Sequence, residues 1–248
     1  MASVRRPPRE WLSSHPALID PSISALDIDV DTAVICSVEG FYPELLRRLG
    51  QVASRNAPPC NGAEKGRVAK DYIIYKAGVG APAQGMLMDT LIASGVGRFI
   101  VTGVAGSLTP KCCIGSIVIP TWGIREEGTS HHYLAAGVVP RPSSSLVKGL
   151  RHALSDENPV LGGIWSIDAP YRETRDKIKE YSRLGAVAID MECTALMSIG
   201  MARKVKMAAV LAITDELWGP EWVQGFGSKK VSAARKAICG SVASILER

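Results

Sequence analysis

Short apolar runs of the kind that form buried strands alternate along this chain with segments of helical periodicity, from residue 32 to residue 246. Strands joined through helices lie parallel and are covered by helices on both faces. The sequence therefore predicts a single-domain three-layer α/β/α fold with a twisted, mixed central sheet that is largely parallel. Expected strands are 32–38, 72–75, 98–102, 116–120, 160–167, 187–190 and 207–213, and expected helices are 43–52, 82–93, 144–154, 172–183, 191–203 and 228–246.

The remaining segments are expected to be irregular. Residues 1–30 are proline-rich and have few periodic apolar positions, so they are expected to form an N-terminal arm ahead of one domain over 31–248. Residues 56–65, rich in Pro and Gly, should form a loop, and the polar stretch 123–133 a functional loop or sheet edge. A chain of 248 residues with 46% hydrophobic residues is long enough for one sizeable core.

Composition argues against several classes of function. A net charge of +5, with no Lys/Arg run longer than two residues, gives little support for nucleic-acid binding. Apolar stretches are too short to span a membrane, and the N-terminus lacks the apolar core of a signal peptide. The six cysteines include no C-x-x-C pair, so we expect reduced thiols, a cytoplasmic protein, and neither a metal nor a cofactor.

The most informative motif is the cassette 188–196, in which an apolar run ends in Asp190-Met191-Glu192 and then turns helical. Open α/β sheets bind ligands at the carboxyl ends of their strands, where a carboxylate can accept two hydrogen bonds from a vicinal diol such as that of ribose. The alternative is a helix cap, because acidic residues also favour the positive end of a helix.

Similar ligand-type segments follow three other expected strands. They are Gly78-Val79-Gly80, the Gly103–Gly106 turn, and Thr214-Asp215-Glu216. Glycines at such positions allow backbone amides to approach a ligand closely. The Gly78 segment lacks the third glycine of a dinucleotide-binding fingerprint, so a Rossmann site is not indicated.

Taken together and in this order, these segments resemble the nucleoside phosphorylase-I family. That family includes purine nucleoside phosphorylases, uridine phosphorylases and methylthioadenosine-type nucleosidases. The resemblance covers roughly residues 30–247 and is carried by segments 78–82, 103–108, 115–120, 125–130, 190–192 and 213–215, with a further likeness in 195–206.

The resemblance implies ribose contacts. Glu192 would accept the 2′- and 3′-hydroxyls, and Met191 would pack against the sugar. His15, in the arm, resembles a histidine that reaches the ribose of a neighbouring subunit, which implies a homo-oligomer, either a hexamer built from dimers or a dimer. For His15 the alternative is a residue in an unstructured tail.

The resemblance also implies base contacts. Asp215 would be the catalytic acid that protonates or hydrogen-bonds a purine at N7, with Thr214, Ala105 and Gly106 beside the base. Cleavage pushes electrons into the base, and a positioned acid accelerates such a step by about 10²–10⁴-fold. Tyr171 would stack on the base. The alternatives are a cap or ion-pair role for Asp215 and helix packing for Tyr171.

The chain departs from the family's phosphorylases at the phosphate site. Their Gly-Asp-Pro-x-Arg motif is replaced by residues 37–41, Ser-Val-Glu-Gly-Phe, and their Arg and Ser/Thr around Gly103 are replaced by Val101 and Val104. An unpaired dianion in a partly buried cleft costs several kcal/mol. Gly80 and Arg125 are the candidate phosphate-binding residues, and Arg47, Arg48, Arg55 and Arg67 are further arginines that could substitute.

Three functions follow as expectations. The favoured one is a transferase that cleaves a purine ribonucleoside with phosphate to free base and ribose-1-phosphate, as in nucleoside salvage. The alternatives are a nucleosidase that uses water on nucleosides or methylthioadenosine-type substrates, and a non-catalytic nucleoside-binding protein on the same fold. Asp215 favours purines, because uridine phosphorylases usually lack that acid.

Overall fold

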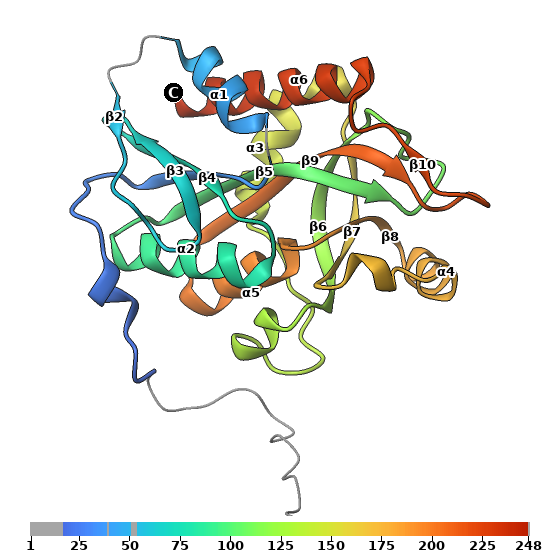
Figure 1. Cartoon of the computed structure of the whole chain (residues 1–248), viewed down its shortest axis with the longest axis horizontal. Helices are drawn as coiled ribbons and strands as arrows, with labels where there is room; N and C mark the ends of the chain where they lie inside the picture. Colours follow the sequence, from blue (N-terminus) through green and yellow to red (C-terminus); the bar gives the residue numbers. More distant parts are fainter. Residues whose placement is uncertain (1–16, 39, 51–53, 248) are drawn as a thin grey trace, which may run out of the picture.

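The expected strands meet in one mixed sheet in the computed structural model, which describes residues 17–38, 40–50 and 54–247 (Figure 1). Within these residues ten strands have the order β10-β9-β6-β7-β8-β5-β1-β4-β3-β2. Their bounds are β1 Thr32–Cys36, β2 Arg55–Asn56, β3 Ala63–Val68, β4 Tyr72–Ala77, β5 Arg98–Ser107, β6 Ile117–Glu126, β7 Val160–Ile167, β8 Ala186–Asp190, β9 Lys206–Glu216 and β10 Val223–Gln224.

The sheet closes on itself over part of its width. Strand β9 pairs in parallel with β5 and antiparallel with β6, and β5 also pairs antiparallel with β8, so β5, β9, β6, β7 and β8 form a ring. Strands β1 and β4 extend the sheet in parallel beside β5. The predicted mixed, largely parallel sheet is confirmed. Closure brings the carboxyl ends of β1, β5, β8 and β9 to one region.

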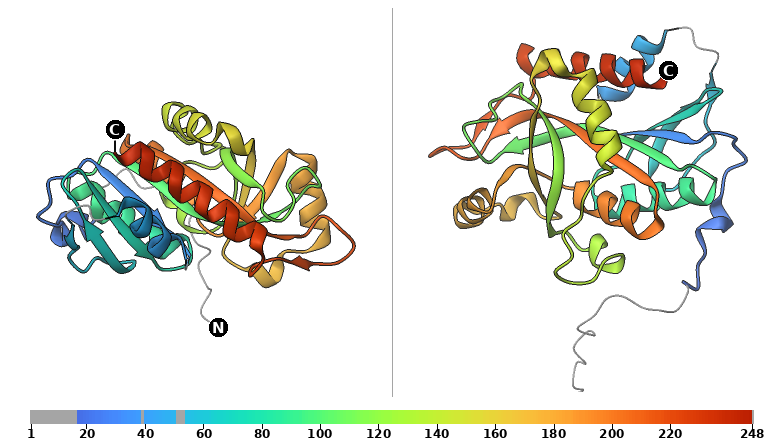
Figure 2. Two further views of the ribbon diagram at one scale, coloured as in Figure 1. Left: turned by 90° about the horizontal axis from the view of Figure 1, so that it is seen from above. Right: turned by 180° about the vertical axis from the view of Figure 1, so that it is seen from behind.

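Helices cover both faces of the sheet, as the views in Figures 1 and 2 show. One face carries α1, α3 and α6 over a core that includes Phe41, Leu45 and Ile238, and the other carries α2 and α5 over a core that includes Leu87, Met88 and Leu196. Helix α4 lies beside β8 and closes a third cluster around Trp165. The bounds are α1 Phe41–Leu49, α2 Ala81–Ala93, α3 Ser144–Ala153, α4 Arg175–Arg183, α5 Cys193–Arg203 and α6 Lys229–Leu246.

Two differences from the sequence-based expectation have clear causes. Strands β5, β6 and β9 run on past their expected ends because they pair with neighbouring strands around the ring. β5 and β9 pair from Arg98 and Lys206 to Ser107 and Glu216, with a register shift between Ala105 and Gly106. The expected loop 56–65 was partly wrong, because its first residue belongs to β2 and its end belongs to β3, which pairs antiparallel with both β4 and β2.

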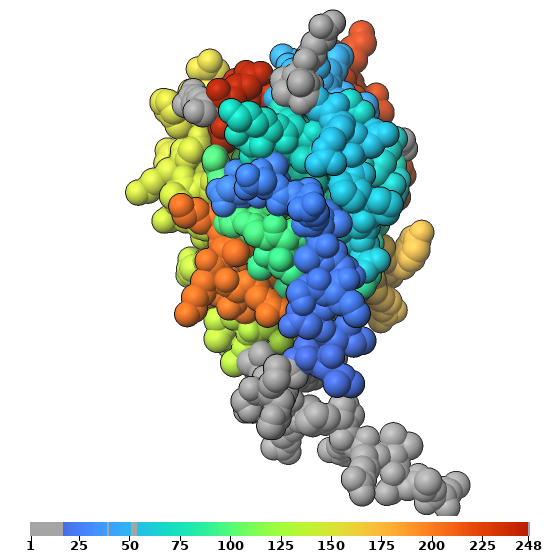
Figure 3. All heavy atoms as spheres, turned by 90° about the vertical axis from the view of Figure 1, so that its left-hand side faces the viewer, coloured from blue at the N-terminus to red at the C-terminus, as the bar shows by residue number. Residues whose placement is uncertain are grey.

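The described part of the N-terminal arm lies on the chain's own surface. It contains the short helix η1, Pro21–Ser24, and runs along α2, where the Leu26 N–H donates to Ser94 Oγ at 2.8 Å (Figure 3). Among the described residues no helix has the length and apolar character needed to cross a membrane. The six cysteines are free, and four of them are buried.

Candidate active site

A cavity of about 160 Å³ opens where the carboxyl ends of β1, β5, β8 and β9 converge. Four acidic residues, here termed the acidic lining, face it: Glu173, Asp190, Glu192 and Asp215. A second group, here termed the neutral lining, comes from the residues just after β1 and from the middle of β5: Ser37, Val38, Val101, Gly103 and Val104. None of the described residues that line the cavity is Lys, Arg or His. The cavity therefore combines an acidic and an uncharged surface.

The two carboxylates of the 188–196 cassette have different tasks. Asp190 Oδ2 accepts the Cys193 N–H at 2.8 Å, and Asp190 Oδ1 accepts the Ser166 hydroxyl. Ser166 Oγ in turn accepts the Thr194 N–H at 3.0 Å, so Asp190 and Ser166 together cap the first turn of α5. The capping interpretation holds for Asp190, which leaves Glu192 available for a ligand.

Glu192 reaches across the cavity to the turn between β4 and α2. Its Oε1 accepts the Gly80 N–H at 2.7 Å, and Gly80 has φ of +97°, a backbone conformation that favours glycine. Burial raises the pKa of Glu192 to about 8, and the nearby Asp190 charge adds to the shift, against the Gly80 hydrogen bond. A hydroxyl donor entering the site would therefore stabilise a carboxylate that burial disfavours.

Gly80 is thus placed beside Glu192. Its N–H already has an acceptor, so the phosphate-binding role predicted for Gly80 would require this N–H to change partner. Met191, the predicted sugar-packing residue, lines the cavity next to Glu192. The structure brings the two predicted ribose-binding residues Met191 and Glu192 together, whereas His15 lies outside the described residues.

The base-binding residues predicted from β5 and β9 also meet at the cavity. Asp215 Oδ1 accepts the Thr214 hydroxyl at 2.8 Å, and its Oδ2 accepts the indole N–H of Trp222 at 2.8 Å. Gly106 leaves room for this carboxylate, because a Cβ on Gly106 would lie 3.2 Å from Asp215 Oδ2 and 2.5 Å from Leu217 Cδ1. Ala105, Gly106, Thr214 and Asp215 all line the cavity.

Glu173 is a site residue that the sequence did not reveal. It lines the cavity near Asp215, and burial together with the Asp215 charge raises its pKa to about 7. The expected helix 172–183 would have made Glu173 an ordinary first-turn acid. Instead the short helix η4, Pro170–Arg172, turns the chain first, and α4 begins only at Arg175. The signal available in the sequence was that Glu173 is an acidic residue close to the start of a helix.

Two predicted site residues lie elsewhere. The Tyr171 side chain is 100% exposed and is not among the lining residues. Arg125 fastens the loop after β6, with Nε donating to Ser130 Oγ at 2.9 Å and Nη1 and Nη2 donating to the Ala135 and Leu134 carbonyls at 2.8 Å each. The N–H groups of Arg125 are thus used within that loop, and Arg125 does not line the cavity.

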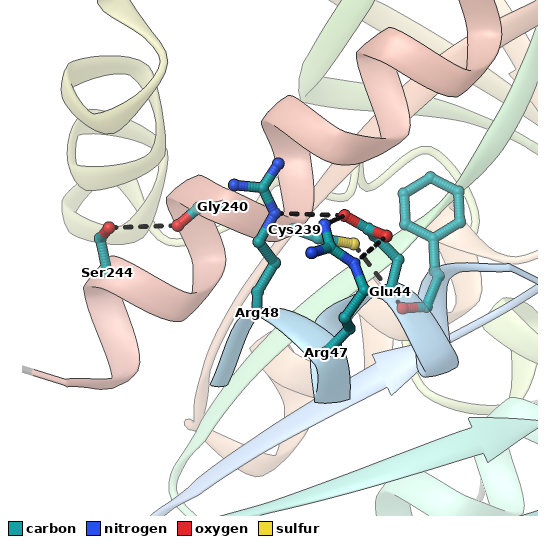
Figure 4. A network of polar contacts seen from close by, with 7 residues as sticks. Glu44, Arg47, Arg48, Cys239, Gly240 and Ser244 are labelled. Atoms are coloured by element: carbon teal, nitrogen blue, oxygen red, sulfur yellow. Dashed lines mark hydrogen bonds and ion pairs between the residues drawn. The ribbon is translucent and has the colours of Figure 1, made fainter. Parts of the chain in front are cut away.

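Three of the other arginines considered as phosphate ligands, Arg47, Arg48 and Arg67, also have partners away from the cavity. Arg47 and Arg48 both bind Glu44 on α1, and the Arg47 hydrogen bond lowers the pKa of Glu44 to about 2 (Figure 4). Arg67 donates to Ser54 and Asn56. Ser37, by contrast, does line the cavity, and its hydroxyl donates to the buried Gln84 at 3.1 Å.

Comparison with known proteins assigns the family. The model of the phosphorylase superfamily matches residues 31–246. This chain is a member of the phosphorylase superfamily. Its fold and ordered motifs agree with that assignment, which confirms the resemblance to purine nucleoside and uridine phosphorylases noted in the sequence.

The individual members described next are less than 30% identical to this chain over the matched residues. The guanosine phosphorylase of Halorubrum lacusprofundi is 26% identical over 149 residues, which are 59% of this chain and 62% of that protein. The uridine phosphorylase of Treponema pallidum is 29% identical over 153 residues, which are 56% and 59% of the two chains. The matched region thus spans about three-fifths of these curated relatives.

Solved structures of the superfamily share the fold over most of the chain. Purine nucleoside phosphorylase from Toxoplasma gondii, in complex with immucillin-H, superposes with a TM-score of 0.78 at 16% identity and covers 89% of this chain and 91% of that one. AMP nucleosidase from Bacteroides thetaiotaomicron gives 0.68 at 23% identity with the same coverage. At these identities the likeness extends to the fold alone.

Proposed function

We propose that this chain cleaves the N-glycosidic bond of a purine ribonucleoside with phosphate, releasing the base and ribose-1-phosphate. The observation that carries the proposal is the acidic lining, which offers Glu192 to a ribose and the pair Glu173–Asp215 to a base in one cavity. Relatives named as guanosine and purine nucleoside phosphorylases support it.

Glu192 would act on the sugar. Its Oε1 accepts the Gly80 N–H, and burial disfavours its charge. Ribose hydroxyls would add two donors to this carboxylate, with Met191 packing against the sugar face. As the bond to the base breaks, positive charge develops on the ribose, and a buried carboxylate stabilises that charge more strongly than water does. The interaction is therefore stronger in the transition state than in the ground state.

Glu173 and Asp215 would act on the base. Two carboxyl groups this close do not both ionise freely, and a pKa of about 7 leaves Glu173 partly protonated at neutral pH. The pair thus combines a proton donor with an acceptor. Purine N7 takes a proton when the base leaves, and the N1–H of a 6-oxopurine would give the pair a donor to bind. We therefore favour inosine or guanosine over adenosine.

Hydrolysis is the second candidate, and the neutral lining favours it. A phosphate dianion beside Val101 and Val104 would meet no cation among the described lining residues, and the acidic lining would repel it. A water molecule carries no such penalty. If phosphate is the nucleophile, its ligands are neutral donors such as the Ser37 hydroxyl, which would have to leave Gln84, and the phosphate requirement should be high.

One experiment tests the proposal and separates its candidates. Inosine, guanosine, adenosine, uridine and methylthioadenosine are incubated with and without phosphate, and free base, ribose-1-phosphate and ribose are measured. Phosphate-dependent release of hypoxanthine or guanine supports the proposal. Free ribose as the sole sugar product in excess phosphate would establish hydrolysis instead, and binding without base release would support a non-catalytic role.

We also propose that the protein is a homo-oligomer, a hexamer built from dimers or a dimer. Large apolar side chains on η1 and α2 and just before η1 are exposed: Leu18, Ile19, Ile23 and Met86. A second copy would bury such a patch. Light scattering at micromolar concentration should give a multiple of 26.5 kDa, and a monomer mass would contradict the proposal.

A further inference from the structure

The chain folds back on the base end of the cavity directly after β9. Residues 217–226, here termed the aromatic hairpin, return through β10, whose Val223 and Gln224 pair antiparallel with Glu216 and Asp215. The Gly225 N–H donates to the Thr214 carbonyl at 2.8 Å. The hairpin exposes four large apolar side chains by 41–56% of their surface: Trp218, Trp222, Val223 and Phe226. Burial therefore does not account for the aromatic residues here.

Trp222 makes one directed polar contact. Its indole Nε1 donates to Asp215 Oδ2 at 2.8 Å, while the Thr214 hydroxyl donates to Oδ1 at 2.8 Å. An indole N–H is a donor only, so its partner oxygen must act as an acceptor. With one donor on each oxygen, the carboxylate plane is fixed and each oxygen keeps a lone pair for a ligand.

The hairpin also forms hydrogen bonds with the start of α4, close in sequence to Glu173. Arg175, the first residue of α4, donates to the Gly219 carbonyl at 3.0 Å and to the Pro220 carbonyl. Arg175 lies two residues after Glu173. Phe226 lines the cavity and contacts Trp222 edge to face, with ring centroids 6.3 Å apart. The same hairpin thus contacts Asp215, the start of α4 and the cavity.

We propose that Trp222 is a positioning residue for Asp215, and that the aromatic hairpin builds the base subsite, with Phe226 as its apolar wall. Trp222 itself does not contact the base in this arrangement. It holds the Asp215 carboxyl group in the plane from which the proton of the Glu173–Asp215 pair passes to purine N7 as the N-glycosidic bond breaks. The inference rests on the proposed cleavage of purine nucleosides and adds a residue and an element to it.

The kinetic test removes the indole N–H and keeps an aromatic ring. Trp222→Phe should lower kcat on inosine about tenfold, the effect of losing one hydrogen bond to a charged group, with little change in KM. On 7-methylinosine, whose base leaves without a proton at N7, Trp222→Phe should retain wild-type kcat. Trp122→Phe, which changes a tryptophan on β6 that does not line the cavity, is the matched control and should behave as wild type on both substrates.

A double-mutant cycle provides the second criterion. In an Asp215→Asn background, Trp222→Phe should cause no further loss on inosine, because the group it positions is gone. Equal losses on inosine and 7-methylinosine, or a full tenfold loss added to that of Asp215→Asn, would overturn the proposal and assign the hairpin a structural role. Circular dichroism and thermal melting establish that each variant is folded.

A spectroscopic readout separates this inference from the proposed function. The indole N–H resonance of Trp222 is the one, among five tryptophans, that Trp222→Phe removes from a ¹H–¹⁵N spectrum. It should move strongly in Asp215→Asn and little in Glu216→Gln, whose Oε1 accepts the Ile114 N–H instead. An unmoved resonance in Asp215→Asn would overturn the contact, even in a protein that cleaves no nucleoside.

Discussion

The acidic and the neutral lining of the cavity differ in what burial does to them: it shifts the pKa values of two of the acidic groups, whereas the neutral groups carry no charge. Glu192 and Glu173 are held where burial works against their charge, and their pKa values are raised to about 8 and about 7. Ser37, Val101 and Val104 offer one hydroxyl and two apolar surfaces, with no charge to be tuned. If the chain acts as proposed, the groups that act on the ribose and the base are acidic and buried or half-buried, whereas the surface offered to the nucleophile is uncharged.

The largest effect is expected for Glu192→Gln. The amide preserves the shape of the side chain but removes the negative charge that would stabilise the cationic sugar, so kcat/KM for inosine should fall by about 10³-fold. Steady-state kinetics on the folded variant measure this loss. Glu216→Gln, on β9 outside the acidic lining, is the matched control. Near-normal turnover in Glu192→Gln would remove Glu192 from the site.

Asp215→Asn tests the base side of the acidic lining. We expect a drop of about 10²-fold in kcat/KM for purine nucleosides, because the amide cannot exchange a proton with the leaving base. Uridine has no N7, so any cleavage of uridine should be affected less. The measured quantity is the ratio of inosine to uridine kcat/KM. A ratio that stays constant would make Asp215 a structural residue.

The raised pKa values of the acidic lining predict an unusual pH profile. Cleavage needs Glu192 ionised, with a pKa of about 8, and Glu173 protonated, with a pKa of about 7, so only a small fraction of the molecules is in the active state at any pH. As a result, kcat/KM should rise as pH passes about 7 and fall as pH passes about 8. The two requirements overlap in a narrow bell between these values. In Glu173→Gln the loss at alkaline pH should disappear while the rise remains, at a lower maximal rate.

The same variant decides which carboxyl group holds the proton. A Glu173→Gln profile that still falls at alkaline pH would assign the transferred proton to Asp215 alone. Asp215→Asn complements this result, because it removes the neighbouring charge that helps to raise the pKa of Glu173. In that variant the Glu173 pKa should therefore drop, and the bell should become broader and lower.

Local sequence patterns predicted the acidic lining better than its surroundings. Asp190, Met191, Glu192 and Asp215 follow directly from strand ends, whose position at one edge of a parallel sheet is set by topology. Glu173 depends on a turn before α4, and Trp222 on a hairpin that forms only through its contacts with β9 and Arg175. Tyr171 shows the limit of such patterns. Its side chain is exposed, whereas Glu173, two residues later, lines the cavity.

The same limit applies to the fold. The central strands were visible because they are buried on both faces and continuously apolar, as β1 is. The extension of β5 contains Gly103 and Gly106, residues that weaken a strand signal. They remain in the sheet because close packing demands small residues, and a Cβ on Gly103 would approach Ser37 Cβ to 3.2 Å.

The smallest predicted effect concerns the neutral lining and the identity of the nucleophile. Val104→Thr replaces a methyl group with a hydroxyl of nearly the same shape, placing one donor in the cavity. If phosphate attacks the ribose, the phosphate concentration at half-maximal rate should fall by about 3–10-fold, the effect of one neutral hydrogen bond. Val104→Ala, which adds no donor, should leave that concentration unchanged or raise it.

If water attacks, base release in phosphate-free buffer will match the rate in phosphate for wild type and both variants. A chain that uses phosphate but gains nothing from Val104→Thr would place the phosphate away from β5, so that the neutral lining faces only the sugar.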